Sequence, residues 1–406
     1  MQERRIRKII CSISAWADAK PGEMEAQSAA GEIGVELVPQ GTLVERLRAG
    51  GAGLAGFYTP TGVGTLVAAG REVREFDGRP YLFEPALRVD YALVRGHRAD
   101  ATGNVELRGG SRHFNVSFAK AARVAVAEVD EVVAPGAIDP ERVGLPGVFV
   151  ARVVAASRPV DLAALIEANR LRKRPPDAPR TYAGKPALSR AQVAARAAAL
   201  LPTGGYVNLG AGIPSLVSDH VATRDITLHT ENGILGYGAV VEGAAIDLDV
   251  YTAGSRFVAL RPGAAFFDSV TSFEMVRGGA LDAVVLGAYQ VDAAGNLANW
   301  TTPDQVGGGI GGAMDLAAGG SRVIVAMEHC DTQGRPKLLR RCTYPLTGLG
   351  CVDTIVTDLA LLVRRDGRFH LTEIAPGFEV AEVLALTEMP VAVDEPVGRM
   401  TDALGA

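Results

Sequence analysis

Short apolar runs separated by glycine turns recur along the chain and predict an α/β protein. Ile9–Ile13 and Val35–Val38 are predicted strands, and Thr42–Ala49 is predicted to be a brief helix with Thr42 as its cap. The continuous apolar runs Tyr91–Val94 and Val124–Ala127 are typical of strands in a buried parallel sheet. Strands of this kind alternating with helices indicate open α/β sheets.

One carboxylate occupies a distinctive position in the second part of the chain. Ile226–Thr230 favours a short buried strand, and Asn232 followed by Gly233 requires a turn directly after it. Glu231 is therefore placed at the carboxyl end of a strand, where open α/β sheets form their ligand crevices. Position alone leaves two interpretations open, a capping or hinge carboxylate and a reactive one.

Two glycine-rich turns add candidate backbone donors. Asn208–Pro214 follows a strand and opens an apolar helix, so its amides either approach an anionic ligand or only form a tight turn. Gly307–Gly312 fits the G-x-G-x-x-G pattern of dinucleotide sites, and Glu328 after the next strand keeps that hypothesis open. However, the stretch before this loop, Trp300–Gln305, is itself a loop and not the strand that the fingerprint needs. Without a nucleotide, the loop still offers amides for an oxyanion.

The chain repeats itself. Asp90–Val105 matches Asp282–Leu297 at a constant offset of 192 residues, including the aspartate and the Gly-Asn pair of a turn. Further on, Arg123–Ala127 matches Arg322–Ala326. Two related α/β halves are the economical explanation, and a cleft between them is the expected place for a site.

The stretch between the repeats changes composition. From Arg170 to Pro186 it is rich in arginine and proline, as in a stiff linker, and Ser189 is then predicted to cap a helix that runs to Leu201. We therefore expect a first domain over residues 1–168, a linker over 169–187 and a second domain over 188–406.

Composition excludes several classes of protein. The 406 residues are 48% hydrophobic and 21% charged, with a net charge of −5, which argues against nucleic acid as a partner. No apolar run is long enough to cross a membrane, and no signal peptide is apparent. Four cysteines without CxxC spacing and six scattered histidines indicate neither a disulfide framework nor a metal site. We expect a cytoplasmic protein without membrane association.

Several motifs, taken together and in order, resemble one enzyme family. The stretch Leu228–Gly236 resembles the catalytic signature of the 3-oxoacid (succinyl-type) coenzyme A transferases of family I. The resemblance covers nearly all of residues 188–390 as the B half of that family, and residues 1–168 resemble its A half from the middle of that half onward. Its other motifs are Asn208–Pro214, Pro262–Asp268, Ser272–Gly279, Leu297–Trp300, Gly311–Leu316, Pro345–Asp353, Pro39–Gly53, Thr59–Gly62, Arg74–Pro80 and Phe114-Asn115.

The resemblance implies two related open α/β domains with the active site at their interface. It implies that Glu231 attacks an acyl-CoA and carries CoA as a glutamyl-CoA thioester, with the Gly312 amide as oxyanion donor and with Asn208 in the site. It also places Gln40, Gly210, Gly212, Asn232, Gly233, Gly309 and Gly311 in the substrate- and CoA-binding site. No metal or redox cofactor is implied, because CoA is itself a substrate. The expected partners are an acyl-CoA and a carboxylic acid, and we expect a homo-oligomer.

The chain departs from the family pattern at three places. Relative to that pattern the A half begins late, so we expect it to lack its N-terminal portion, including a glycine turn and an active-site asparagine. Thr252–Ser255, followed by Arg256, replaces an Asn-Ala-Gly-Lys stretch, and Gln305 and Gly308 stand where lysines are common. Substrate choice therefore stays open. So do two other hypotheses, a catalytically impaired partner subunit and a dinucleotide-binding oxidoreductase.

Overall fold

The computed structural model describes residues 3–14, 22–158, 161, 164, 179–305 and 307–400, and most of the predicted linker lies outside this range. We call residues 3–158 the N-terminal half and residues 179–400 the C-terminal half. The described α-helices are α1 (Glu23–Ala29), α2 (Gln40–Gly51), α3 (Asn115–Ala121), α5 (Arg190–Ala199), α6 (Ile213–Leu216), α7 (Ser269–Arg277), α8 (Ala313–Ala318) and α9 (Val380–Ala385). None of them combines the length and the apolar character that crossing a bilayer requires.

A ten-stranded mixed sheet forms the C-terminal half. In spatial order its strands are β16 (Val258–Phe266), β15 (Ile234–Val240), β14 (Thr227–Thr230), β13 (Tyr206–Leu209), β17 (Ala283–Leu286), β20 (Arg322–Ala326), β22 (Thr354–Val356), β23 (Ala360–Arg365), β24 (Arg368–Ile374) and β25 (Val391–Arg399). The strands β14, β13, β17, β20 and β22 run parallel to one another. The predicted strand that precedes Glu231 is thus confirmed inside this sheet.

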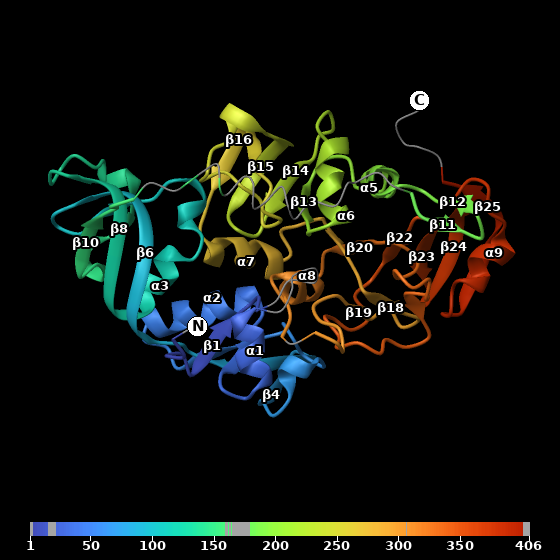
Figure 1. Ribbon diagram of the computed structural model, residues 1–406, viewed down its shortest axis with the longest axis horizontal. Helices are drawn as coiled ribbons and strands as arrows, with labels where there is room; N and C mark the ends of the chain where they lie inside the picture. Colours follow the sequence, from blue (N-terminus) through green and yellow to red (C-terminus); the bar gives the residue numbers. More distant parts are fainter. Residues whose placement is uncertain are drawn as a thin grey trace.

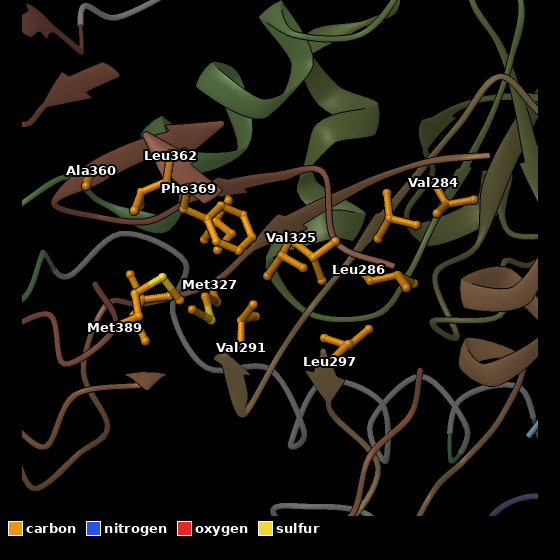
Figure 2. Close-up of a cluster of buried hydrophobic side chains, with 14 of the residues drawn as sticks. Val284, Leu286, Val291, Leu297, Val325, Met327, Ala360, Leu362, Phe369 and Met389 are labelled. Atoms are coloured by element: carbon orange, nitrogen blue, oxygen red, sulfur yellow. The ribbon is translucent and has the colours of Figure 1, made fainter. Parts of the chain in front are cut away.

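Both faces of the central parallel strands are covered, as a parallel sheet requires. Alternate residues Val284 and Leu286 of β17 pack with Phe273 of α7 and with Phe369 of β24 in one core, part of which Figure 2 shows. The intervening residues Ala283 and Val285 face the opposite side and pack against α5 and α6. Ser189 caps α5, as the sequence predicts, and the structure adds a reciprocal hydrogen bond from the Ser189 backbone amide to the Gln192 side chain.

A smaller sheet forms the far end of the N-terminal half (Figure 1). Its spatial order is β10 (Arg152–Ala155), β8 (Ala122–Val133), β6 (Val89–Asp100), β7 (Val105–Glu106) and β9 (Val143–Leu145). The predicted runs around Leu93 and Val126 pair in parallel, as expected, but the expected burial is wrong for the first of them, because one face of β6 is open to solvent. Helix α3 covers one face of this sheet. On the other face Tyr91 is 66% and Leu93 is 84% exposed.

Within the described ranges, four small sheets accompany these two. They pair β1 (Lys8–Cys11) with β2 (Gly34–Leu37), β3 (Gly56–Thr59) with β5 (Arg79–Pro85) and β4 (Val73–Phe76), β11 (Thr181–Tyr182) with β12 (Lys185–Pro186), and β18 (Gln290–Asp292) with β19 (Leu297–Ala298) and β21 (Leu338–Leu339). The β11–β12 hairpin falls within the stretch assigned to the linker. It packs on the C-terminal half, where the Tyr182 hydroxyl donates to Asp358 at 2.9 Å.

The internal repeat is present in three dimensions. Asp100 accepts hydrogen bonds from the backbone and side-chain amides of Asn104, and Asp292 accepts the same pair from Asn296. In both turns the glycine before the asparagine adopts a positive φ. The two halves therefore share this turn in detail.

The second sequence match needs a correction of one residue. Tyr91 pairs with Val124, whereas its counterpart Ala283 pairs with Arg322 and not with Val323. A one-residue shift moves every side chain of a strand to the other face of the sheet. The first match keeps its offset of 192 residues, so the exposed Tyr91 and Leu93 correspond to Ala283 and Val285, on the side of β17 that α5 and α6 cover.

Helices α2, α7 and α8 pack together where the two halves meet (Figure 1). Helix α2 begins at Gln40, not at Thr42, so the predicted cap is wrong. Its first amides are satisfied by the other half of the chain: Gln40 N–H donates to the Gly311 carbonyl at 2.8 Å, and Gly41 N–H donates to the Asp315 carboxylate at 2.9 Å. A cap supplied from a distant segment leaves no local sequence signal.

Candidate active site

The turn after β14 fixes the place of Glu231. Gly233 has a φ of +102°, and a Cβ atom there would lie 2.1 Å from the carbonyl oxygen of Phe267. Asn232 is buried, accepts from the Thr230 hydroxyl at 2.8 Å and donates to the Tyr251 carbonyl at 2.7 Å. The hydrogen-bonding groups of Asn232 are thus used within the protein. This turn directs the Glu231 side chain toward the other glycine loop.

Glu231 lies against the N-terminus of α8. Its carboxylate accepts a hydrogen bond from the backbone amide of Gly312. A Cβ atom on Gly312 would lie only 1.9 Å from Oε2 of Glu231. Burial and then the negative charge of Asp315 raise the pKa of Glu231 to about 7, and the Gly312 hydrogen bond opposes that rise. The arrangement is a desolvated, basic carboxylate facing a backbone donor.

The loop that carries Gly312 is held by the beginning of the chain. The backbone carbonyl of Ser12 accepts from the Gly311 amide at 3.2 Å, and the Ser14 N–H donates to the Gly308 carbonyl at 2.8 Å. Gly308 has no room for a side chain, because a Cβ atom would lie 2.7 Å from the Trp300 carbonyl oxygen. The loop therefore serves as a strand-like partner of residues 12–14, a pairing that no local sequence pattern predicts.

Gln40 reaches the same loop from the N-terminal half. A Cβ atom on Gly311 would lie 4.0 Å from both Gln40 Oε1 and Glu231 Oε1, so these two side chains flank Gly311. The Gln40 amide nitrogen lies 3.3 Å from Nε2 of His113, and Nδ1 of His113 contacts the hydroxyl of Ser269. Burial lowers the pKa of His113 to about 4, so the ring is neutral at pH 7. A neutral ring accepts from Gln40 and donates to Ser269.

Asn208 is directed at a neighbouring strand. Its side-chain nitrogen lies 3.0 Å from Nδ1 of His229, and Nε2 of His229 lies 3.1 Å from the hydroxyl of Ser272. Burial lowers the pKa of His229 to about 4. The histidine, two residues before Glu231, is therefore a neutral link between β13 and α7. Asn208 supports the strand that carries Glu231 rather than contacting the carboxylate in this structure.

The remaining glycines have different surroundings. The Gly210 amide donates to the Val285 carbonyl at 2.9 Å and the Gly309 amide to the Trp300 carbonyl at 2.8 Å, so both donors are occupied. Gly212 precedes α6 with a φ of +80° and has open space around its Cβ position. The structure thus brings Glu231, Gly312, Gly311 and Gln40 together. Asn208, Gly210, Gly309, Asn232 and Gly233 support the backbone around them.

Sequence reasoning missed three polar side chains at this centre. His113 contacts Gln40, and Arg277 contacts Asp315. Asp315 in turn accepts from the Gly41 amide. Asp315 and Arg277 lie within the family-like motifs Gly311–Leu316 and Ser272–Gly279, but the partners of Asp315 come from residues far away in sequence. Among the described residues, no group of three or more His, Cys, Asp or Glu side chains is arranged to hold a metal ion.

The acidic residue that kept the dinucleotide hypothesis open is engaged elsewhere. Glu328 accepts from the guanidinium of Arg190 through Nε at 2.7 Å, and Arg180 lies 3.8 Å away. The glycine loop is preceded by an irregular segment, as the sequence predicts, and not by a strand. Both observations weigh against a nucleotide ribose at this place.

Comparisons with known proteins agree with this geometry. A family model described as coenzyme A transferase matches residues 1–156 and 190–386. Mouse succinyl-CoA:3-ketoacid coenzyme A transferase 2A is 42% identical, over 97% of this chain and 78% of its own length. The human transferase 2 is also 42% identical, over 96% of this chain and 77% of its own length. The acyl-CoA transferase YdiF of Escherichia coli O157:H7 has the same fold, with a TM-score of 0.76, 22% identity and coverage of 98% of this chain and 81% of that one.

The expected cytoplasmic location is wrong on this comparison. The mouse, human and rat relatives are named as mitochondrial proteins. Free cysteines indicate a reducing compartment but do not distinguish one such compartment from another. With a matching family model over most of its length and relatives at 42% identity, the chain belongs to the coenzyme A transferase family.

Proposed function

We propose that the protein transfers coenzyme A between an acyl-CoA and a 3-oxo acid or another short carboxylic acid, with Glu231 as the nucleophile. The observation that carries this proposal is the contact of a desolvated Glu231 with the Gly312 amide at the junction of the two halves. The names of the relatives at 42% identity support the substrate class, since they act on succinyl-CoA and 3-ketoacids.

The reaction balances without an added reagent. A Glu231 oxygen attacks the thioester carbonyl, the C–S bond breaks, and an acyl-glutamyl anhydride and CoA thiolate result. The thiolate attacks the glutamyl carbonyl, which releases the first acid and leaves CoA on Glu231 as a thioester. A second carboxylate then reverses these steps and departs as the new acyl-CoA. No metal or redox cofactor takes part in this proposal.

The surroundings of Glu231 suit each step. A carboxylate with a pKa of about 7 is more basic, and so more nucleophilic, than an exposed one, yet a large fraction is ionised at neutral pH. The Gly312 amide loses its carboxylate partner when Glu231 is acylated. It then becomes available for the oxyanion of the tetrahedral intermediate. Binding energy from the remote part of CoA contributes the rest of the barrier reduction.

Substrate choice within this class cannot depend on the family lysines, because Ser255, Gln305 and Gly308 stand at their positions. Arg256 donates to the Ser215 carbonyl at 2.7 Å and pairs with Asp219 at 3.3 Å. Gly308 cannot carry a side chain without displacing Trp300. We therefore propose short acids such as acetoacetate as acceptors and succinyl-CoA or acetyl-CoA as donors, to be separated by competition between the two donors.

The direct test is covalent capture of CoA. Wild-type protein mixed with acetoacetyl-CoA should gain the mass of CoA less one water molecule on the peptide that holds Glu231, and Glu231→Gln should gain none. Turnover by freshly prepared Glu231→Gln at the wild-type rate would refute the mechanism, because an amide does not form the anhydride. A folded wild-type chain that forms no adduct favours the second hypothesis, a catalytically impaired partner subunit.

We also propose that the protein is a homo-oligomer. The exposed apolar side chains of Tyr91 and Leu93 support this proposal, and sedimentation velocity tests it.

A further inference from the structure

Asp315 is a fully buried carboxylate at the junction of the two halves. It belongs to the first turn of α8, three residues after Gly312. It accepts from the Gly41 amide at 2.9 Å, from the Thr61 hydroxyl at 3.1 Å and from the Arg277 guanidinium at 3.3 Å. Two of these three donors come from the N-terminal half of the chain.

The approach of the N-terminal half to Asp315 is unusually close. A Cβ atom on Gly41 would lie 2.4 Å from Oδ1 of Asp315, so only glycine permits this contact. Asp315 also satisfies one of the free amides at the start of α2, where a negative charge is favoured by the helix dipole. Burial raises the pKa of Asp315, and Arg277, Gly41 and Thr61 oppose the rise. All three partners donate to the carboxylate, an arrangement that favours its ionised form.

The same residue is tied to the reacting carboxylate. Gly312, whose amide binds Glu231, is the N-cap residue of α8, so a displacement of Asp315 displaces that amide. Among the described residues, the charged groups in this cluster are Arg277 from α7, Glu231 after β14 and Glu45 from α2. Glu45 lies 3.3 Å from Arg277 and so shares the cation with Asp315.

We propose that Asp315 is a positioning residue through which the N-terminal half holds α8, and with it the Gly312 amide, against Glu231. This proposal rests on the proposed function. Glu231 and the Gly312 amide both belong to the C-terminal half, yet on this proposal they need the N-terminal half. Gly41 and Thr61 supply hydrogen bonds to the Asp315 carboxylate, which burial would otherwise leave short of partners.

The test measures single-turnover formation of the glutamyl-CoA adduct from acetoacetyl-CoA between pH 5.5 and 8.5. Asp315→Asn removes a negative charge beside Glu231, so the acid limb of the rate profile should move to lower pH by about one unit. The ratio of the rate at pH 6 to the rate at pH 8 should then rise about fivefold, while the plateau rate falls.

Two further variants separate positioning from charge. Thr61→Val keeps Asp315 but removes one donor from the N-terminal half, so we expect the plateau rate to fall about fivefold. Thr61→Ser keeps the hydroxyl and should restore the rate. The matched control is Asp292→Asn, another buried aspartate, which accepts from Ala294 and Asn296 in the turn after β18. It should lower the melting temperature without moving the acid limb.

The outcomes are distinct. An acid limb that does not move in Asp315→Asn, or a wild-type plateau rate in Thr61→Val, overturns the inference. An equal shift in Asp292→Asn would also overturn it, because the effect would then follow from destabilisation alone. If the wild-type protein forms no adduct at any pH, the proposed function itself fails, and that result is recognised before any variant is compared.

Discussion

Oε2 of Glu231 lies 1.9 Å from the point that a Cβ atom on Gly312 would occupy. The φ of Gly312 is −87°, so the glycine is required by this contact and not by backbone strain. We expect Gly312→Ala to push Glu231 away from the amide and to reduce kcat by at least about 100-fold. Gly34→Ala is the control, because its Cβ position is 3.8 Å from its nearest neighbours. Near wild-type kcat in Gly312→Ala would show that the contact is dispensable.

Glu231→Gln should stabilise the protein in a pH-dependent way. The pKa of Glu231 is raised to about 7, above its value in an unfolded chain, so ionisation costs folding free energy as pH rises from about 4.5 to 7. The gain in unfolding free energy of Glu231→Gln over wild type should therefore grow over this range to about 3 kcal/mol and then stay constant. Urea unfolding at pH 5 and pH 8 measures it. A gain that shrinks with rising pH would contradict the raised pKa.

His113 should act through Gln40. His113→Phe removes the acceptor for the Gln40 amide and leaves it free to reorient, so we expect KM for the carboxylic acid to rise about fivefold. His113→Gln keeps an acceptor and should restore most of the affinity. The wild-type ring is neutral above about pH 5, since burial lowers the pKa of His113 to about 4. Equal KM values for wild type and His113→Phe would show that the orientation of Gln40 by His113 does not contribute to binding of the carboxylic acid.

The uncovered face of the N-terminal sheet should promote association. Leu93 and Tyr91 are exposed there, although the corresponding side of β17 is covered by helices. We expect Leu93→Arg to reduce self-association in sedimentation velocity and binding of a hydrophobic dye. Leu66→Arg, also at a position exposed to solvent, is the control and should change neither. If both variants behave like wild type, this face does not mediate contacts between copies.

Steady-state kinetics should be ping-pong. CoA stays on the enzyme between the two acids, so each acid acts in a separate half-reaction. Double-reciprocal plots at several fixed concentrations of the second substrate should give parallel lines. A set of lines that intersect would instead indicate a ternary complex and direct transfer.

Much of the local structure follows from the sequence because it depends on neighbouring residues. The strand before Glu231, the turn at Asn232, the capping box at Ser189 and the repeated aspartate turns all have local patterns and are present. The start of α2 could not be read this way, since its cap comes from Gly311 and Asp315. The match between β8 and β20 in the sequence differs by one residue from their alignment in the structure. Both strands are runs of similar apolar residues, so the sequence alone does not determine which residues correspond.

The sequence by itself determined the α/β class, the two related halves, the family and the position of Glu231 at the end of a strand. The tertiary structure decided what surrounds that carboxylate: the Gly312 amide, the clamp from Ser12 to Ser14, the Gln40–His113 pair and the buried Asp315. These contacts join residues far apart in the chain, so no periodicity or spacing records them. The contacts of Ser12, Ser14 and Asp315 arise only when the two halves dock, because docking removes water and gives these buried polar groups partners from the other half.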